Sequence, residues 1–293
     1  MTKVFPSKYV IDGPPAEPPR YSLLTIAELA TDNGSQPEDA DVARWQGGLE
    51  WLPEMQNQGG TIGYGCLGNT AALTLDHTVP SVRSAEPFLV YAEDHCSTFG
   101  FEAHDFGGRA TRQLLATQSY QVAQEFEQGV LAQAGLGGRT YDNDYLTKNP
   151  TVVGSPSAQA PQAALGDVEM GLAALFGGAR CMIHASPALL TALVVGNVLT
   201  LSGNKWLTPM QNIVVSDAGY TGDNGTSNQW LFGTGMVRYR ISPVSLVPGN
   251  YDQAFAEATD RATNDVVIIA ERAVLLQWDE GTVAAETNIP KFS

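Results

Sequence analysis

The clearest pattern along the chain is a helical stripe between Arg109 and Ala134. Its members recur every three or four positions, the spacing that places side chains on one face of an α-helix: Leu115, Ser119, Val122, Phe126, Val130 and Ala134. Leu114, Ala123 and Leu131 widen the stripe, and Gly135, Gly137 and Gly138 are expected to end it. The spacing predicts one helix of about 26 residues, roughly 39 Å long.

Two shorter helices are predicted further along. Ser157 and Pro161 precede an apolar stripe made of Leu165, Val168, Leu172 and Leu175. Ser186 followed by Pro187 is typical of an N-cap with proline at the first helical position, and this predicts a helix that continues through Val195.

Alternating or continuous apolar runs predict the strands. They lie within residues 87–103, 181–183, 213–220, 229–247 (two strands around Gly233 to Gly235) and 265–278. The polar loop 221–228 between two of them is expected to be mobile. Helices and strands together indicate an α+β fold.

Two segments near the N-terminus lack the pattern of a packed layer. Five prolines within residues 1–20 exclude a helix or a central strand there, so we expect an extended arm. Residues 44–88 are rich in glycine and hold strand-like runs such as LTLDHTV, which predicts a long two-stranded excursion.

Charge and composition narrow the classes of protein. Acidic residues outnumber basic ones 31 to 16, giving a net charge of −15, which argues against a general nucleic-acid binder. Only 16% of residues are charged, 43% are hydrophobic, and Gly and Pro are frequent. We therefore expect many turns, and a surface partly covered by another molecule, including copies of this chain.

Cys66, Cys96 and Cys181 form no CxxC pair, so neither a disulfide framework nor a thiolate zinc site is expected. The N-terminal residues hold no apolar run typical of a signal peptide, and the apolar stretch 188–201 is too short for a membrane span. The sequence thus predicts an unexported protein in a reducing compartment.

Three short motifs suggest chemistry but lack its context. Residues 63–68 match G-x-G-x-x-G without a preceding buried strand, so a glycine-rich loop is the better interpretation than a dinucleotide site. Ser202 to Lys205 match S-x-x-K without companion motifs, which indicates a turn between a helix and a strand. His95 and Cys96, near His104, are neighbours on a predicted strand and therefore point to opposite faces. No catalytic, cofactor-binding or metal-binding residue is predicted.

The order of these elements resembles the major capsid proteins of tailed bacteriophages, which have the Hong Kong 97 fold shared with encapsulin shells. The passages GARCMIHASPALLTAL, LTLSGNKWLTPMQNIVVSDAGY, QWLFGTGMVRYRIS and DVVIIAERAVLLQWDEGTVAAETNI carry the resemblance, which covers about residues 20–290 and is closest in wording to capsids of actinobacteriophages.

The resemblance implies a division into four parts. These are an N-terminal arm (1–43), an extended loop (44–88), a peripheral domain with the long helix as its spine (89–140 and 236–293) and an axial domain (141–235). It implies a major capsid protein that assembles as hexamers and pentamers into an icosahedral head enclosing double-stranded DNA, without sequence-specific binding. It also implies a virion protein assembled in the bacterial cytoplasm, without a membrane.

The resemblance further implies a separate scaffold protein, because the chain has no room for the long scaffolding extension of some relatives. A portal and a decoration protein are the other implied partners. Three alternatives stay open at this stage: an encapsulin-type nanocompartment shell, a minor virion structural protein, and a hydrolase whose site the sequence does not reveal.

Overall fold

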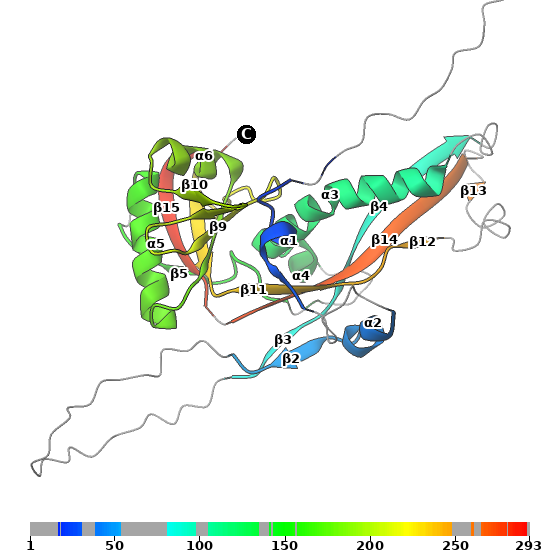
Figure 1. Cartoon of the computed structure of the whole chain (residues 1–293), viewed down its shortest axis with the longest axis horizontal. Coiled ribbons are helices and arrows are strands. Elements are labelled where there is room, and N and C mark those ends of the chain that lie inside the picture. Colours follow the sequence, from blue (N-terminus) through cyan, green and yellow to red (C-terminus); the bar gives the residue numbers. More distant parts are fainter. Residues whose placement is uncertain are drawn as a thin grey trace, which may run out of the picture.

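The computed structural model describes residues 17, 19–30, 39–53, 81–97, 105–134, 141, 143–155, 157–247, 259–260, 265–279 and 281–291. In these residues the chain forms two mixed layers of helix and sheet, which lie side by side and share the long helix α3 (Figure 1). The predicted arm at 1–20 and most of the glycine-rich segment lie outside the described residues.

A seven-stranded sheet forms one layer. In spatial order its strands are β5 (Thr151–Val152), β15 (Val283–Pro290), β10 (Asn228–Thr234), β6 (Met182–Ala185), β9 (Ile213–Ser216), β8 (Lys205–Leu207) and β7 (Thr200–Ser202). Helices α5 (Pro161–Phe176) and α6 (Pro187–Val195) lie against this sheet (Figure 1). The predicted N-cap is confirmed, because the Ser186 hydroxyl accepts a hydrogen bond from the backbone N–H of Leu189.

The centre of this sheet is buried on both faces. Every residue of β6 and β9 is buried, as their continuous apolar runs predict for central strands. Ile183 and Val214 belong to the core shared with α5 and α6, whereas Met182 and Val215 belong to the core shared with α3. Both faces of the central strands are therefore covered by this chain alone, while the edge strands β5 and β7 are exposed.

The second sheet is built around one long strand, β14 (Asp265–Trp278), whose bounds are those predicted. Its partners are β4 (Phe88–Ser97), β11 (Val237–Ile241), β12 (Ser245–Val247) and β13 (Thr259–Asp260), all antiparallel to it, and β1 (Glu28–Leu29) extends the sheet beside β11. Residues of β4 alternate, with Phe88, Val90 and Ala92 buried under α3 and Leu89 and Tyr91 exposed. This alternation is typical of a sheet with one covered face.

The segment 236–293 is divided between the two sheets. Strands β11 and β14 lie in the six-stranded sheet, whereas β15 pairs along β10 in the seven-stranded sheet, with Phe232 opposite Ala284. The chain crosses between them within a few residues at Gly281, whose φ of 103° lies in the region that favours glycine.

The long helix α3 covers Phe106–Gln128 and is followed by a short helix, α4 (Val130–Ala134). It begins where Asp105 accepts a hydrogen bond from Gly108 N–H. The prediction of one continuous helix to Ala134 is wrong, because Gly129 adopts a left-handed φ of 60°. A Cβ atom built there would lie 2.1 Å from the Tyr145 ring, so this position requires glycine for both reasons.

The buried face of α3 is also rotated slightly from the predicted one. Ser119, Val122 and Phe126 are buried as predicted, but Leu115 is 39% exposed and Leu114 takes the buried position. Both leucines fit a 3.6-residue period, and the neighbouring sheet decides between them.

A small two-stranded ribbon leaves the molecule beside α2 (Asp39–Trp45). Its strands are β2 (Leu49–Trp51) and β3 (Arg83–Ala85), which pair antiparallel with Glu50 opposite Ser84. This pairing confirms the predicted two-stranded excursion at its root, while residues 54–80 lie outside the described part. Trp45 and Ala85 bury Leu275 of β14, so the root rests on the six-stranded sheet. A four-residue helix, α1 (Leu23–Ile26), packs near α3.

Candidate functional site

Among the described residues, those singled out in the sequence for their chemistry form no common site. His95 lies exposed on β4, where its Nε2 is 3.3 Å from Glu93 Oε1. Ser202 and Lys205 face each other across the hairpin turn between β7 and β8, so the S-x-x-K motif is a turn, but one between two strands rather than after a helix. The G-x-G-x-x-G motif at 63–68 and the side chain of Cys96 lie outside what the structure describes.

A buried polar cluster lies where α3 crosses the seven-stranded sheet. His184 of β6 contacts two hydroxyls, with Nδ1 3.2 Å from Tyr220 Oη and Nε2 2.9 Å from Thr234 Oγ1. Its ring meets that of Phe126 edge-on, with centroids 5.2 Å apart. Burial lowers the pKa of His184 to about 3, so the imidazole is neutral at physiological pH. It acts as a hydrogen-bonding core residue, the ordinary interpretation of a lone histidine.

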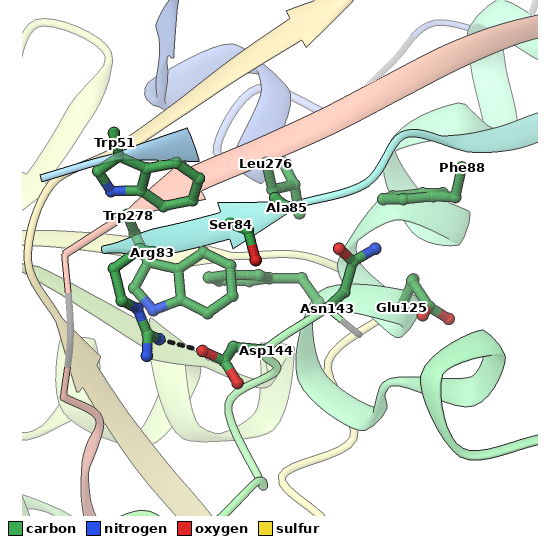
Figure 2. Close-up of a pocket in the computed structure, with 11 residues that line it drawn as sticks. Trp51, Arg83, Ser84, Ala85, Phe88, Glu125, Asn143, Asp144, Leu276 and Trp278 are labelled. Atoms are coloured by element: carbon green, nitrogen blue, oxygen red, sulfur yellow. Dashed lines mark hydrogen bonds and ion pairs between the residues drawn. The ribbon is translucent and has the colours of Figure 1, made fainter. Parts of the chain in front are cut away.

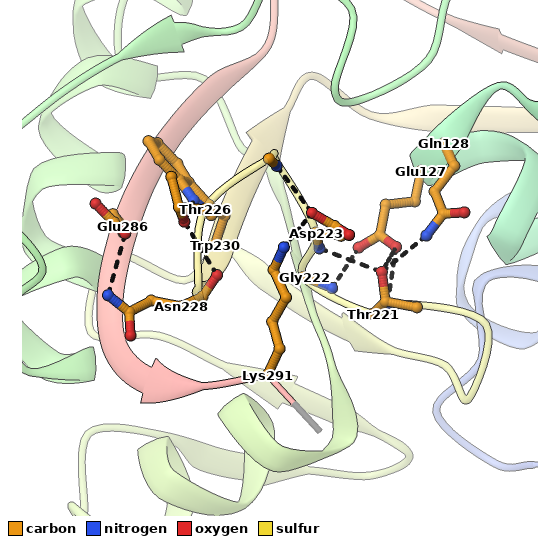
Figure 3. A network of polar contacts seen from close by, with 11 residues as sticks. Glu127, Gln128, Thr221, Gly222, Asp223, Thr226, Asn228, Trp230, Glu286 and Lys291 are labelled. Carbon is orange, nitrogen blue, oxygen red and sulfur yellow. Dashed lines mark hydrogen bonds and ion pairs between the residues drawn. The ribbon is translucent and has the colours of Figure 1, made fainter. Parts of the chain in front are cut away.

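Two buried carboxylates of this region tie α3 to the loop after β9. Asp217 accepts a hydrogen bond of 2.6 Å from Ser119 Oγ of α3. Glu127, at the end of α3, accepts three: from Thr221 N–H at 2.7 Å, Thr221 Oγ1 at 2.8 Å and Gly222 N–H at 2.8 Å (Figure 3). Burial raises the pKa of both carboxyl groups. The sequence signal for this attachment, the acidic pair Glu125 and Glu127 in an apolar helix end, is weak.

The polar loop that follows is held at its start. In addition to the contacts of Thr221 and Gly222 with Glu127, Asp223 forms an ion pair with Lys291, which directly follows β15 (Figure 3). Asp223 also accepts a 2.8 Å hydrogen bond from Gly225 N–H. The Lys291 ammonium lowers the pKa of Asp223. These contacts attach the loop to α3 on one side and to the last strand on the other, which is not the arrangement of the mobile loop expected.

A small cavity lies between the ribbon root and the end of α3. Its volume of about 20 Å³ is room for about one water molecule. Its lining is strongly aromatic, with Trp51, Phe88, Phe126 and Trp278, three of which are labelled in Figure 2 (Trp51, Phe88 and Trp278). Within the described residues, Glu125 Oε1 and Trp51 Nε1 have no hydrogen-bond partner, and burial raises the pKa of Glu125.

These polar groups connect the two layers of the molecule. The buried polar groups bond to backbone and hydroxyl groups of neighbouring elements and so fix one layer to the other. In the part of the chain that the structure describes, no group of three or more His, Cys, Asp or Glu side chains is placed to hold a metal ion. No described helix is long and apolar enough to cross a membrane.

Comparison with known proteins rests on structure alone. No protein-family model matches the sequence, and no curated protein matches it. Among solved structures, a chain of Gordonia phage Cozz is 10% identical with a TM-score of 0.53, covering 98% of this chain and 91% of its own. The capsid of an empty GTA particle gives 13% identity and a TM-score of 0.53, covering 97% and 95%. The SrpI encapsulin complex of Synechococcus elongatus gives 11% and 0.52, covering 93% and 88%.

These likenesses extend over nearly the whole length of both chains in each pair, so they concern the complete architecture and not one layer. At identities this low they establish the fold and no more. The α+β fold predicted from the sequence is confirmed. The chain has the Hong Kong 97-like fold of phage capsid and encapsulin shell proteins.

Proposed function

We propose that the chain is a major capsid protein, which assembles with copies of itself as hexamers and pentamers into an icosahedral phage head. The observation that carries the proposal is the match over more than nine-tenths of both chains to the Gordonia phage chain and the GTA capsid. In this role the protein is structural and not an enzyme, in keeping with a polar centre built for attachment.

The charge of the chain suits a wall around DNA. A net charge of −15 disfavours tight contact with phosphates, so the head would enclose double-stranded DNA without sequence-specific binding. The protein would be a virion component assembled in the host cytoplasm with a separate scaffold protein, a portal and, in some heads, a decoration protein.

The division into arm (1–43), extended loop (44–88), peripheral domain (89–140 and 236–293) and axial domain (141–235) is proposed with one change. Strand β15 belongs with the axial domain, since it pairs with β10. The ribbon of β2 and β3 would be the root of the extended loop, which reaches over a neighbouring copy.

Negative-stain microscopy of the purified full chain tests the proposal. Closed shells, or separate hexamers and pentamers, are expected; a chain that stays monomeric at all concentrations, or that turns over a substrate, would overturn it.

An encapsulin-type shell is the second candidate, favoured by the likeness to the SrpI complex. The contents of particles isolated from the native source separate the two. Nuclease-protected double-stranded DNA supports the phage head, and a co-purified cargo enzyme inside DNA-free particles supports the nanocompartment.

A further inference from the structure

One short segment touches both the ribbon root and the end of α3. Residues 143–147 follow α4 and lie beside β3, and Figure 2 shows Asn143 and Asp144 below Ser84 and Arg83. We call this segment, 143–147, the bracket. Its sequence, Asn-Asp-Tyr-Leu-Thr, begins with two short polar side chains, and Tyr145 separates them from a buried leucine, Leu146.

The first end of the bracket holds the ribbon through two neighbouring residues. The Asn143 side-chain amide pairs with the backbone of Glu86, accepting from its N–H at 2.8 Å and donating to its carbonyl at 2.9 Å. Asp144 forms an ion pair with Arg83 and a second one, at 2.9 Å, with Lys148. The two contacts, at Arg83 of β3 and at Glu86 directly after it, are three residues apart, so together they limit both rotation and sliding of β3.

The second end of the bracket donates hydrogen bonds to the last turn of α3. Leu146 N–H donates to Phe126 carbonyl at 2.9 Å, and Thr147 donates to Glu127 carbonyl from its N–H and from its hydroxyl, each at 3.1 Å. These carbonyls belong to the last turn of the helix, whose acceptors have no partner inside the helix. Glu127 is also the residue that attaches α3 to the seven-stranded sheet.

We propose that Asn143 and Asp144 are positioning residues that set the direction in which the ribbon leaves the molecule, by tying β3 to the end of α3. This inference rests on the proposed function, in which the ribbon is the root of the loop that reaches a neighbouring copy. A two-stranded ribbon of three-residue strands cannot hold its own direction. The apolar contact of Ala85 with Leu275 keeps the root on the sheet, but apolar packing is not directional.

A distance measurement within the full chain tests the bracket. Spin labels are attached at Leu52→Cys, beside the ribbon, and at Leu115→Cys, on α3; both positions are exposed. Cys66 and Cys96 are replaced by Ser, and Cys181 is left, because it is buried and its thiol pKa is raised to about 11. The labelled chain is diluted into an excess of unlabelled chain, so only distances within one molecule are recorded.

The background is expected to give one narrow distance distribution. Asn143→Ala combined with Asp144→Ala should make it roughly twice as wide or shift its maximum. Asn143→Asp keeps the acceptor and loses the donor to Glu86, so an intermediate width is expected. Asn228→Ala is the matched control, since it removes a side-chain amide contact with Glu286 in the seven-stranded sheet and should leave the distribution unchanged.

The proposal is overturned if the distance distribution is equally narrow in the double variant and in the background chain. It is also overturned if the distribution of the background chain is already broad. If the double variant does not fold, as circular dichroism would show, Asn143→Asp alone decides on the same criterion. A purely structural role predicts a lower melting temperature in all three variants without a change in width. Particle formation by the background chain is scored separately, so a failure of the proposed function shows as absent shells with an unaltered distance result.

Discussion

The two sheets of the molecule differ in how their faces are covered. In the seven-stranded sheet, β6 and β9 are buried on both sides by α5, α6 and α3, all from the same chain. In the six-stranded sheet, α3 covers one side of β4, while Leu89 and Tyr91 on the other side are 58% and 56% exposed. The central strands of the first layer are covered on both sides within one chain, whereas β4 of the second layer exposes apolar side chains to water.

The difference teaches where this chain is stable alone and where it depends on neighbours. A layer with two covered faces gains the full free energy of apolar burial. A sheet with one covered face gains less free energy from apolar burial. The two-stranded ribbon on its surface needs additional contacts to be stable. We therefore expect the stability of the isolated chain to be concentrated at the seven-stranded sheet and its junction with α3.

The largest expected effect is at that junction. Phe126→Ala removes a side chain that is 1% exposed and contacts both His184 and Trp278, so it should lower the free energy of unfolding by about 3–5 kcal/mol. Leu115→Ala on the same helix, at an exposed position, is the control and should cost less than about 1 kcal/mol. Chemical denaturation measures both; equal losses would mean that α3 is rotated from the position described.

The break between α3 and α4 should give the next largest effect. Gly129→Ala combines a left-handed backbone with a contact against the Tyr145 ring, and we expect a loss of about 2–3 kcal/mol in thermal or chemical unfolding. Gly203→Ala has a similar φ of 64° with open space around it, so it should cost only about 1 kcal/mol. If both variants lower the free energy of unfolding by the same amount, the contact with the Tyr145 ring does not contribute to the loss.

Hydrogen exchange sharpens the comparison for the ribbon. In unassembled chains the amides of β2 and β3 should exchange at least about tenfold faster than those of β6 and β9, because a short two-stranded ribbon opens by disturbing only the small cluster around Leu275. In assembled particles the ribbon amides should slow while α3 stays protected in both states. Unchanged protection of β2 and β3 on assembly would place the ribbon within the monomer's own core.

The smallest effect concerns pH. Burial raises the folded-state pKa of Glu127 above its unfolded value, so its contribution to stability is fully present below the unfolded pKa and is lost as pH rises through the folded one. The difference in unfolding free energy between the native chain and Glu127→Gln should therefore be largest near pH 4 and shrink toward pH 7. Urea titrations along this range measure it. A difference that grows with pH would reverse the sign of the shift.

The sequence predicts well what depends on local pattern. The bounds of β14 and the cap at Ser186 follow from an apolar run and from a Ser-Pro pair, which act over a few neighbouring residues. The end of α3 at Gly129 could not be predicted, because the Tyr145 ring that leaves no room for a Cβ there is brought back only after α4. A glycine inside a regular stripe gives no sign of its φ.

The candidate site was harder to predict than the fold. His184, Asp217 and Glu127 come from three elements, and each alone resembles an isolated polar residue in an apolar context. Only their contacts with Tyr220, Ser119 and Thr221 show that they join α3 to the seven-stranded sheet. Their partners are decided by the packing of the layers, a relation that no spacing in the sequence records.

The position of β14 has a consequence for synthesis on the ribosome. Strand β4 is made early, but its pairing partner is β14, one of the last strands of the chain. At about 5–20 residues per second the wait is on the order of tens of seconds, during which β4 can rest on α3 but has no strand beside it. The seven-stranded sheet already has β6, β9 and β10 by then. Nascent chains therefore carry an unfinished β4 edge, and crowded polysomes are where premature strand exchange between copies is most favoured.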